Sequence, residues 1–245
     1  MIRLGPFFKY YGSKHQIAAR YPRPKHNRVI EPFAGSAQYA TLHHTRDVVL
    51  VDSWLPVVEC WRYLINATKE DILALPLLEP EQRVEELELE PVQRWLVRCW
   101  LGTISVRPCR KLSGWALSDI ARGWSTYWGK RCRLRLANQV HHINHWTVLH
   151  GSYTDIEESS PSTWFIDPPY QDKGYKYVHG SELLDYDALG VWSRTRNGQV
   201  IVCENEGAGW LPFRPLCSAQ SGVHRIQPKK EAIWTKDCWR QGELF

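Results

Sequence analysis

Val29-Ile30-Glu31-Pro32-Phe33-Ala34-Gly35-Ser36-Ala37 is the stretch that decides the fold. Its apolar start is typical of a short buried strand, and a helix-like stretch follows from Gln38 to His44. A second apolar run, Val48-Val49-Leu50-Val51, ends at Asp52 and precedes another helical stretch at residues 56–67. Strands that alternate with helices in this way predict an α/β fold with a parallel sheet.

The same pattern resumes far along the chain. Strands are expected at residues 146–149, 163–166 and 199–203, a helix at 186–195, and a late strand at 230–234. Between the two parts, residues 79–90 carry six Glu against Arg83, a net charge of −5, and are expected to form an exposed helix or linker. The simplest architecture is one domain from residues 1–65 and 147–245, with an insertion at residues 66–146.

Composition narrows the class of protein. The 245 residues fit one large domain or one domain with an inserted subdomain, and 43 % of them are apolar, enough for a core. No apolar run reaches the length of a membrane span and no signal peptide is evident, so we expect a cytoplasmic protein without a membrane partner. The seven Cys are scattered without a Cys-x-x-Cys pair, which fits reduced thiols and predicts no metal site.

Asp167-Pro168-Pro169-Tyr170 follows directly on the strand expected at residues 163–166. The Asp167 carboxylate and the rigidly held Pro168 carbonyl can both accept N–H bonds from an exocyclic amine, turning its lone pair toward an electrophilic methyl group. The Tyr170 ring can stack on a base that has left its helix. The alternative is an ordinary Asp-Pro turn after a strand.

The turn at residues 31–37 has the form of a ligand-binding turn between a strand and a helix. Gly35 lets the backbone approach a ligand closely, and Asp52 stands at the end of the next strand, where a carboxylate can bind ribose hydroxyls or cap a helix. Phosphate-binding glycine motifs are absent, so a nucleoside with a charged amino-acid tail fits best. Lys14 would face the carboxylate of that tail and Tyr10 its cationic sulfur, unless the N-terminal stretch is a basic arm that touches phosphate.

In their order along the chain, these motifs resemble those of the Dam-like DNA adenine-N6 methyltransferases. The resemblance implies a Rossmann-like sheet with one late antiparallel strand and S-adenosylmethionine as the methyl donor. It implies Asp167, Pro168, Pro169 and Tyr170 as catalytic residues, and Tyr170 and Tyr177 as the target-base pocket. The implied cofactor-binding residues are Tyr10, Lys14, Glu31, Pro32, Phe33, Ala34, Gly35, Asp52, Ser152 and Asp167.

Three places depart from the family pattern. After Tyr170 the family often has a polar run that ends in aromatics, and this chain reads Gln171-Asp172-Lys173-Gly174-Tyr175-Lys176-Tyr177. Ala37 replaces the second glycine of the family's turn, and Gly151-Ser152-Tyr153 replaces its Gly-Asp-Phe. The acid that meets the adenine of the cofactor is therefore missing at Ser152, and Ser152 or Asp155 is expected to take its place.

Residues 91–149 carry ten Lys and Arg against Asp119, a net charge of +9. A segment of this charge favours contact with double-stranded DNA over a merely solvated basic face. Residues 107–115 are expected to form a loop or hairpin that enters a groove, and three alternating Arg are expected on one face of a strand. The expected DNA-binding residues are Arg107, Arg110, Lys111, Lys130, Arg131, Arg133 and Arg135.

The expected activity is methyl transfer from S-adenosylmethionine to adenine N6 in DNA, with base flipping, in a bacterial or phage-encoded enzyme. Cytosine N4 in DNA and adenine N6 in RNA remain alternative substrates, because both also require an activated exocyclic amine. A non-catalytic DNA-binding protein on a methyltransferase scaffold is the third possibility, motivated by Ala37 and Ser152. The target sequence and the oligomeric state are not readable from the sequence.

Overall fold

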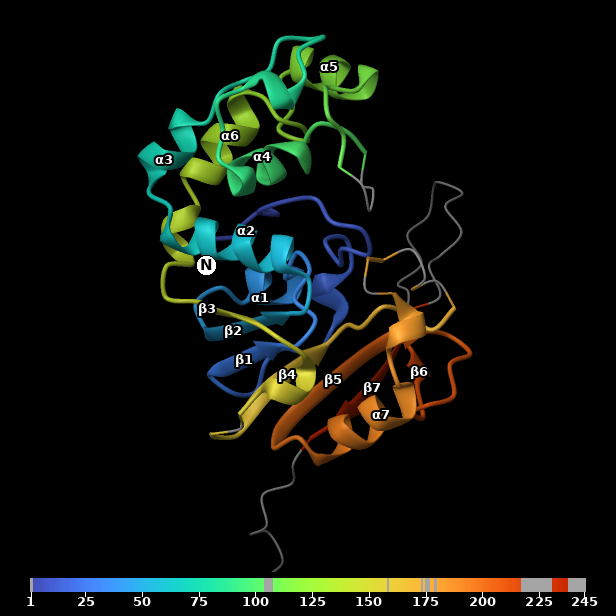
Figure 1. The fold of residues 1–245 in the computed structure, drawn as a ribbon. Helices are drawn as coiled ribbons and strands as arrows, with labels where there is room; N and C mark the ends of the chain where they lie inside the picture. The colour runs from blue at the N-terminus through green and yellow to red at the C-terminus, as the bar shows by residue number, and fades with distance from the viewer. Residues whose placement is uncertain are drawn as a thin grey trace, which may run out of the picture.

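The computed structural model describes residues 2–103, 108–157, 159–172, 174, 177–178, 180–216 and 231–237. Within these residues, seven strands form one sheet in the order β3-β2-β1-β4-β5-β7-β6 (Figure 1). The strands are β1 (Arg28–Glu31), β2 (Asp47–Asp52), β3 (Thr147–His150), β4 (Ser162–Ile166), β5 (Gly198–Asn205), β6 (Arg214–Pro215) and β7 (Glu231–Lys236).

The sheet is parallel from β3 to β5, and only β7 runs against its neighbours. Parallel pairs join β1 to β2 and β4, β2 to β3, and β4 to β5. Strand β7 pairs antiparallel with both β5 and β6. The expected α/β fold with a mostly parallel sheet and one late antiparallel strand is therefore confirmed, and it is compatible with a Rossmann-like arrangement.

The side chains of the central strands divide between two cores because successive residues of a strand point to opposite faces. On one face, Val29 and Phe165 pack with α1 (Gln38–Leu42) and α2 (Leu55–Asn66). On the other face, Ile30 and Trp164 pack with α7 (Tyr186–Thr195). Strands buried on both faces explain the continuous apolar runs of the sequence.

The described part of residues 66–146 alternates helices with loops and lies over the outer side of α2 (Figure 1). Its helices are α3 (Lys69–Ala74), α4 (Pro91–Arg98), α5 (Gly114–Ala121) and α6 (Lys130–Ala137). Leu96 of α4 and Leu136 of α6 belong to the same buried cluster as Trp61 of α2. One continuous core thus joins this segment to the α1 and α2 face of the sheet.

One local expectation in this segment is wrong, and a second is confirmed only in part. Residues 131–135 lie in helix α6 and form no strand, because Cys132, Leu136 and Ala137 are buried at helical spacing, which outweighs the alternation of the Arg residues. Residues 108–113 form the expected loop, but α5 begins at Gly114, where the Ser113 side chain accepts the N–H of Ala116. The acidic residues 79–90 form an exposed linker with one 3₁₀ turn at Val84–Glu86, as expected.

Candidate functional site

A cavity of about 520 Å³ opens at the carboxyl ends of the parallel strands. The sheet order reverses at β1, since the chain continues to β2 and β3 on one side and returns to β4 on the other. Ligands of open α/β sheets bind at such a reversal, and the cavity has the size of a small-molecule site. Glu31, Asp52, Ser152 and Asp167 line it, each from just after or at the end of a different strand.

The turn after β1 brings its backbone against the cavity. Gly35 has a φ of +43°, and a Cβ at this position would lie 3.1 Å from the ring of Tyr10. Ala37 also has a positive φ, of 42°, and is the N-cap of α1. A glycine would adopt this conformation more readily, so Ala37 holds its backbone under some strain. Pro32, Phe33 and Ala34 complete the lining of the turn.

Glu31 stabilises the beginning of helix α1. Its Oε1 accepts the N–H of Ala40 at 2.6 Å, which replaces the side-chain cap that Ala37 cannot supply. Glu31 is only 2 % exposed. Burial raises the pKa of Glu31 well above its usual range, although the Ala40 N–H lowers it.

The Asp52 carboxylate joins the turns that follow β1 and β2. Oδ2 accepts the N–H of Gly35 at 2.9 Å, and Oδ1 accepts the N–H of Trp54 at 2.8 Å. Helix α2 has Trp54 as its N-cap, so the alternative that Asp52 caps this helix is wrong. The carboxylate fixes the two turns relative to each other at the wall of the cavity.

Ser152 lines the cavity, whereas the Asp155 carboxylate serves the backbone of its own turn. Asp155 Oδ2 accepts the N–H of Ser152 at 2.7 Å and caps the 3₁₀ turn Tyr153–Asp155. Of the two residues expected to replace the missing acid, Ser152 is the one at the cavity. The Tyr153 and Phe33 rings lie beside it, with centroids 5.7 Å apart and planes inclined by 31°.

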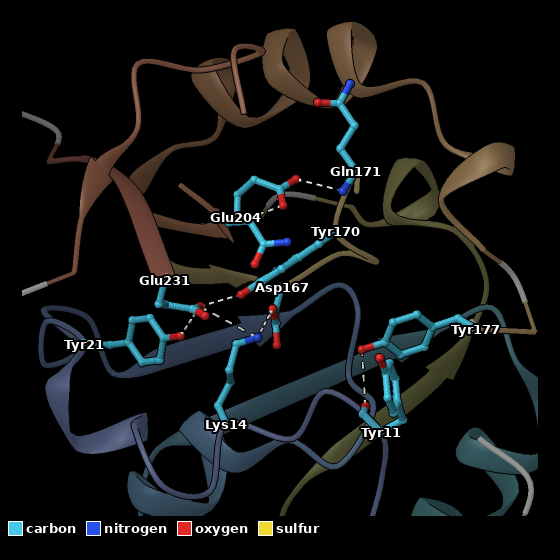
Figure 2. A network of polar contacts seen from close by, with 10 residues as sticks. Tyr11, Lys14, Tyr21, Asp167, Tyr170, Gln171, Tyr177, Glu204 and Glu231 are labelled. Atoms are coloured by element: carbon cyan, nitrogen blue, oxygen red, sulfur yellow. Dashed lines mark hydrogen bonds and ion pairs between the residues drawn. The ribbon is translucent and has the colours of Figure 1, made fainter. Parts of the chain in front are cut away.

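Asp167 at the end of β4 forms a buried ion pair with Lys14. The Lys14 Nζ lies 2.8 Å from Asp167 Oδ1, and the two side chains are 9 % and 19 % exposed (Figure 2). Burial raises the pKa of Asp167, although Lys14 opposes this shift. Burial alone would lower the pKa of Lys14, but the carboxylates of Asp167 and Glu231 outweigh it and hold that pKa above its ordinary value.

The residues after Asp167 are held from several elements. Pro168 is buried, and the Pro169 carbonyl accepts the hydroxyl of Tyr186 at 2.6 Å. The Tyr170 hydroxyl donates to Glu231, and the Lys14 ammonium lies 4.3 Å from the centre of the Tyr170 ring. A Tyr held by a hydrogen bond at one end and a cation at its face has a fixed ring orientation.

Tyr177 lies across the cavity from this group, beside the N-terminal stretch. Its hydroxyl donates to the Tyr11 carbonyl at 3.3 Å (Figure 2). Its ring centroid lies 6.2 Å from that of Tyr10. The structure thus brings Tyr10, Lys14, Asp167 and Tyr177 to one cavity.

Sequence reasoning missed Glu231 and Tyr21 as site residues. Glu231 begins β7 and accepts hydroxyl hydrogen bonds from both Tyr21, at 2.6 Å, and Tyr170. The available signal was an acid at the start of an otherwise apolar strand, Glu231-Ala232-Ile233, where it is 7 % exposed. Buried acids need partners, which marks such a position for attention.

The expected DNA-binding residues differ in whether their charged groups are bound to the protein or exposed. Arg133 and Arg135 are bound to the protein, since their Nη1 atoms donate to the carbonyls of Leu75 at 2.6 Å and Pro6 at 2.8 Å. Lys130 and Arg131 are exposed. Arg110 and Lys111 form exposed ion pairs with Glu85 and Glu81, and Arg107 lies outside the described residues.

No protein-family model matches the chain, and a comparison with curated proteins finds no match either. No helix of the described residues is both long enough and apolar enough to cross a membrane. Within the same ranges, no group of three or more His, Cys, Asp or Glu side chains is arranged to hold a metal ion.

Proposed function

We propose that the protein transfers a methyl group from S-adenosylmethionine to the N6 amine of adenine in double-stranded DNA. The observation that carries the proposal is the place of Asp167. Its buried carboxylate, followed by Pro-Pro-Tyr, lines the same cavity as the glycine-containing turn after β1 and the acid after β2. An amine acceptor and a nucleoside-binding turn in one cavity are what methylation of an exocyclic amine requires.

The residues of the cavity fit S-adenosylmethionine. Gly35 opens the backbone to a ligand, the Phe33 and Tyr153 rings offer apolar faces to an adenine, and the Asp52 carboxylate stands where ribose hydroxyls would bind. The Tyr10 ring at the same wall can face a cation. When bound, the cofactor supplies an electrophilic methyl group on a positively charged sulfur.

The chain's own residues hold and activate the target amine. The Asp167 carboxylate accepts one N–H bond and the Pro168 carbonyl the other, which orients the nitrogen lone pair toward the donor. Tyr170 and Tyr177 supply rings on which a flipped base stacks. The amine is itself the nucleophile, so no covalent bond between enzyme and base forms.

DNA contact is proposed for the exposed part of the basic segment. Lys130 and Arg131 are exposed, whereas Arg133 and Arg135 bind backbone carbonyls. Exposed cations neutralise phosphates and supply affinity that depends on salt. We therefore assign DNA contact to Lys130 and Arg131.

Transfer of labelled methyl from S-adenosylmethionine to unmethylated duplex DNA, with nucleoside mass spectrometry, tests the proposal. N6-methyladenine is the expected product, and Asp167→Ala should abolish it while duplex binding stays within about threefold. N4-methylcytosine would change the target base, and label only in RNA would change the substrate. A protein that binds duplex DNA but no S-adenosylmethionine would overturn the proposal in favour of a non-catalytic scaffold.

A further inference from the structure

The direction of β7 brings Glu231 close to Asp167, on the side of Asp167 that faces away from the cavity. This strand runs antiparallel to β5, so its first residue pairs with Asn205 at the carboxyl end of β5, the edge where the cavity opens. The Glu231 carboxylate, 7 % exposed, faces inward from this edge. A side chain from the last described strand thereby reaches the residues that follow β4 (Figure 2).

Three groups converge on the Glu231 carboxylate, all on its Oε1. The Tyr21 hydroxyl donates to it at 2.6 Å, the Tyr170 hydroxyl also donates to it, and the Lys14 Nζ lies 3.7 Å away. Lys14 and Tyr170 both interact with Asp167. Glu231 therefore sets the position of both neighbours of Asp167 without standing in the cavity lining.

The charges of this group do not balance. Two carboxylates, of Asp167 and Glu231, share one ammonium, of Lys14, so the ionised cluster carries one excess negative charge. In a buried site such a charge acts strongly on its surroundings. Without Glu231, the ammonium would pair with Asp167 alone and cancel its charge.

We propose that Glu231 is a positioning residue: it holds Lys14 and Tyr170 in place and leaves Asp167 with an uncancelled negative charge facing the target amine. The inference rests on the proposed methyl transfer. An amine that attacks a methyl group gains positive charge at nitrogen as the bond forms, and a fixed negative charge beside it stabilises that transition state. The bond from nitrogen to the methyl carbon would form as the bond from carbon to sulfur breaks; the electron pair of the broken bond stays on sulfur, which becomes neutral, and the proton that the nitrogen then loses passes to solvent.

The replacement Glu231→Gln tests the charge while keeping the shape of the side chain. At saturating DNA and S-adenosylmethionine we expect kcat to fall tenfold to about a hundredfold, the effect of a slightly misplaced reacting group, with KM values unchanged. Transfer requires ionised Asp167, and removal of a like charge makes Asp167 ionise at lower pH. The acid limb of the kcat profile should therefore move to lower pH.

Other groups near Asp167 stay the same in this variant. They are Lys14 from the N-terminal stretch, Tyr170 and Tyr177 from the chain after β4, Glu31 from β1, and Cys203 and Glu204 from β5. The matched control is Tyr21→Phe, which removes a hydroxyl from Glu231 but keeps its charge, and should leave the pH profile unmoved. Glu231→Asp restores the charge with a shorter side chain and should restore the wild-type acid limb.

A second readout needs neither cofactor nor DNA. Carboxyl ¹³C NMR follows the titration of Asp167 in the free protein, and its midpoint should lie at lower pH in Glu231→Gln than in wild type or Tyr21→Phe. An unchanged midpoint would overturn the inference, as would wild-type kcat with an unmoved acid limb. A shifted midpoint in a protein without methyl transfer would keep the charge coupling and reject the proposed function. Should Glu231→Gln not fold, Tyr170→Phe separates charge from anchoring. This variant keeps the charge of Glu231 but removes a hydrogen bond that lowers the pKa of Asp167, so the Asp167 midpoint should move to higher pH, opposite to the shift expected for loss of the Glu231 charge.

Discussion

Replacing Lys14 by Met should destabilise the protein strongly, because it leaves two carboxylates in the interior without their shared cation. The Lys14 Nζ lies 2.8 Å from Asp167 Oδ1 and 3.7 Å from Glu231 Oε1. At an effective dielectric constant of about 20, these attractions are about 6 and about 4 kcal/mol, and the desolvation of the ammonium offsets a large part of them. We expect the free energy of unfolding to fall by about 3–5 kcal/mol at pH 8, the usual effect of removing one partner from a buried ion pair.

The loss should depend on pH in a defined direction. Burial already raises the pKa of Asp167, and without Lys14 nothing as close opposes that shift. An acid with a raised pKa in the folded state binds more protons there than in the unfolded state, so stability falls as pH rises through the folded pKa. The deficit of Lys14→Met should therefore be largest above this pKa and shrink toward acidic pH, where Asp167 is protonated in both states.

Urea unfolding followed by circular dichroism at pH 5 and pH 8 measures this difference. Asp47→Asn is a matched control, since the Asp47 carboxylate forms a long, surface ion pair with Arg28, at 3.9 Å. A loss for Lys14→Met below about 1 kcal/mol, or one equal at both pH values, would refute the reasoning.

Gly198→Ala should lower the free energy of unfolding by about 3–5 kcal/mol in the same urea assay. The φ of Gly198 is +108°, and a Cβ there would lie 2.1 Å from the Ser162 carbonyl oxygen. A loss below about 1 kcal/mol would contradict this backbone geometry. Lys130→Ala and Arg131→Ala should each reduce the slope of log Kd for DNA against log salt by about 0.9, measured by fluorescence anisotropy. Arg135→Ala should leave that slope unchanged and instead lower stability by about 1–3 kcal/mol, since its guanidinium binds a backbone carbonyl. Equal slopes for all three variants and the wild type would contradict the assignment of DNA contact to helix α6.

The sheet was predictable where single strands carry their own signal. The apolar runs at β1, β2 and β4 each end at an acid or a turn. Because these strands are buried on both faces, their residues are apolar in succession and do not alternate with polar ones. The alternation of Arg131, Arg133 and Arg135 predicts a strand where helix α6 lies, while the weaker signal of Cys132 and Leu136 has the helical period. The spacing of long charged residues is a poor indicator of helix or strand, because their stems can cover buried surface while the head group reaches water or a backbone carbonyl.

The residues that line the cavity were predictable from the sequence, whereas the hydrogen bonds and ion pairs between them were not. Motifs after β1 and β4 indicated the residues that meet at the cavity, since parallel strands end at one edge of a sheet. The partners of Lys14 come from residues 167 and 231, far along the chain, so only the packing of the sheet brings them together. The fixed hydroxyl of Tyr170 depends on the same antiparallel β7, whose register no local pattern specifies.

Residues 66–146 do not form a cassette that could be exchanged between proteins. Leu101 and Leu136 pack in one cluster with Trp61 and with Phe7 of the N-terminal stretch, and Trp100 donates its indole N–H to the Phe7 carbonyl at 3.2 Å. A segment transplanted from another protein would have to reproduce the apolar surface that packs against α2 as well as the exposed surface. Otherwise the side of α2 would be open to water. Replacements that alter what this segment contacts without disturbing the core are therefore expected at exposed positions, such as Trp115 on α5, which is 73 % exposed.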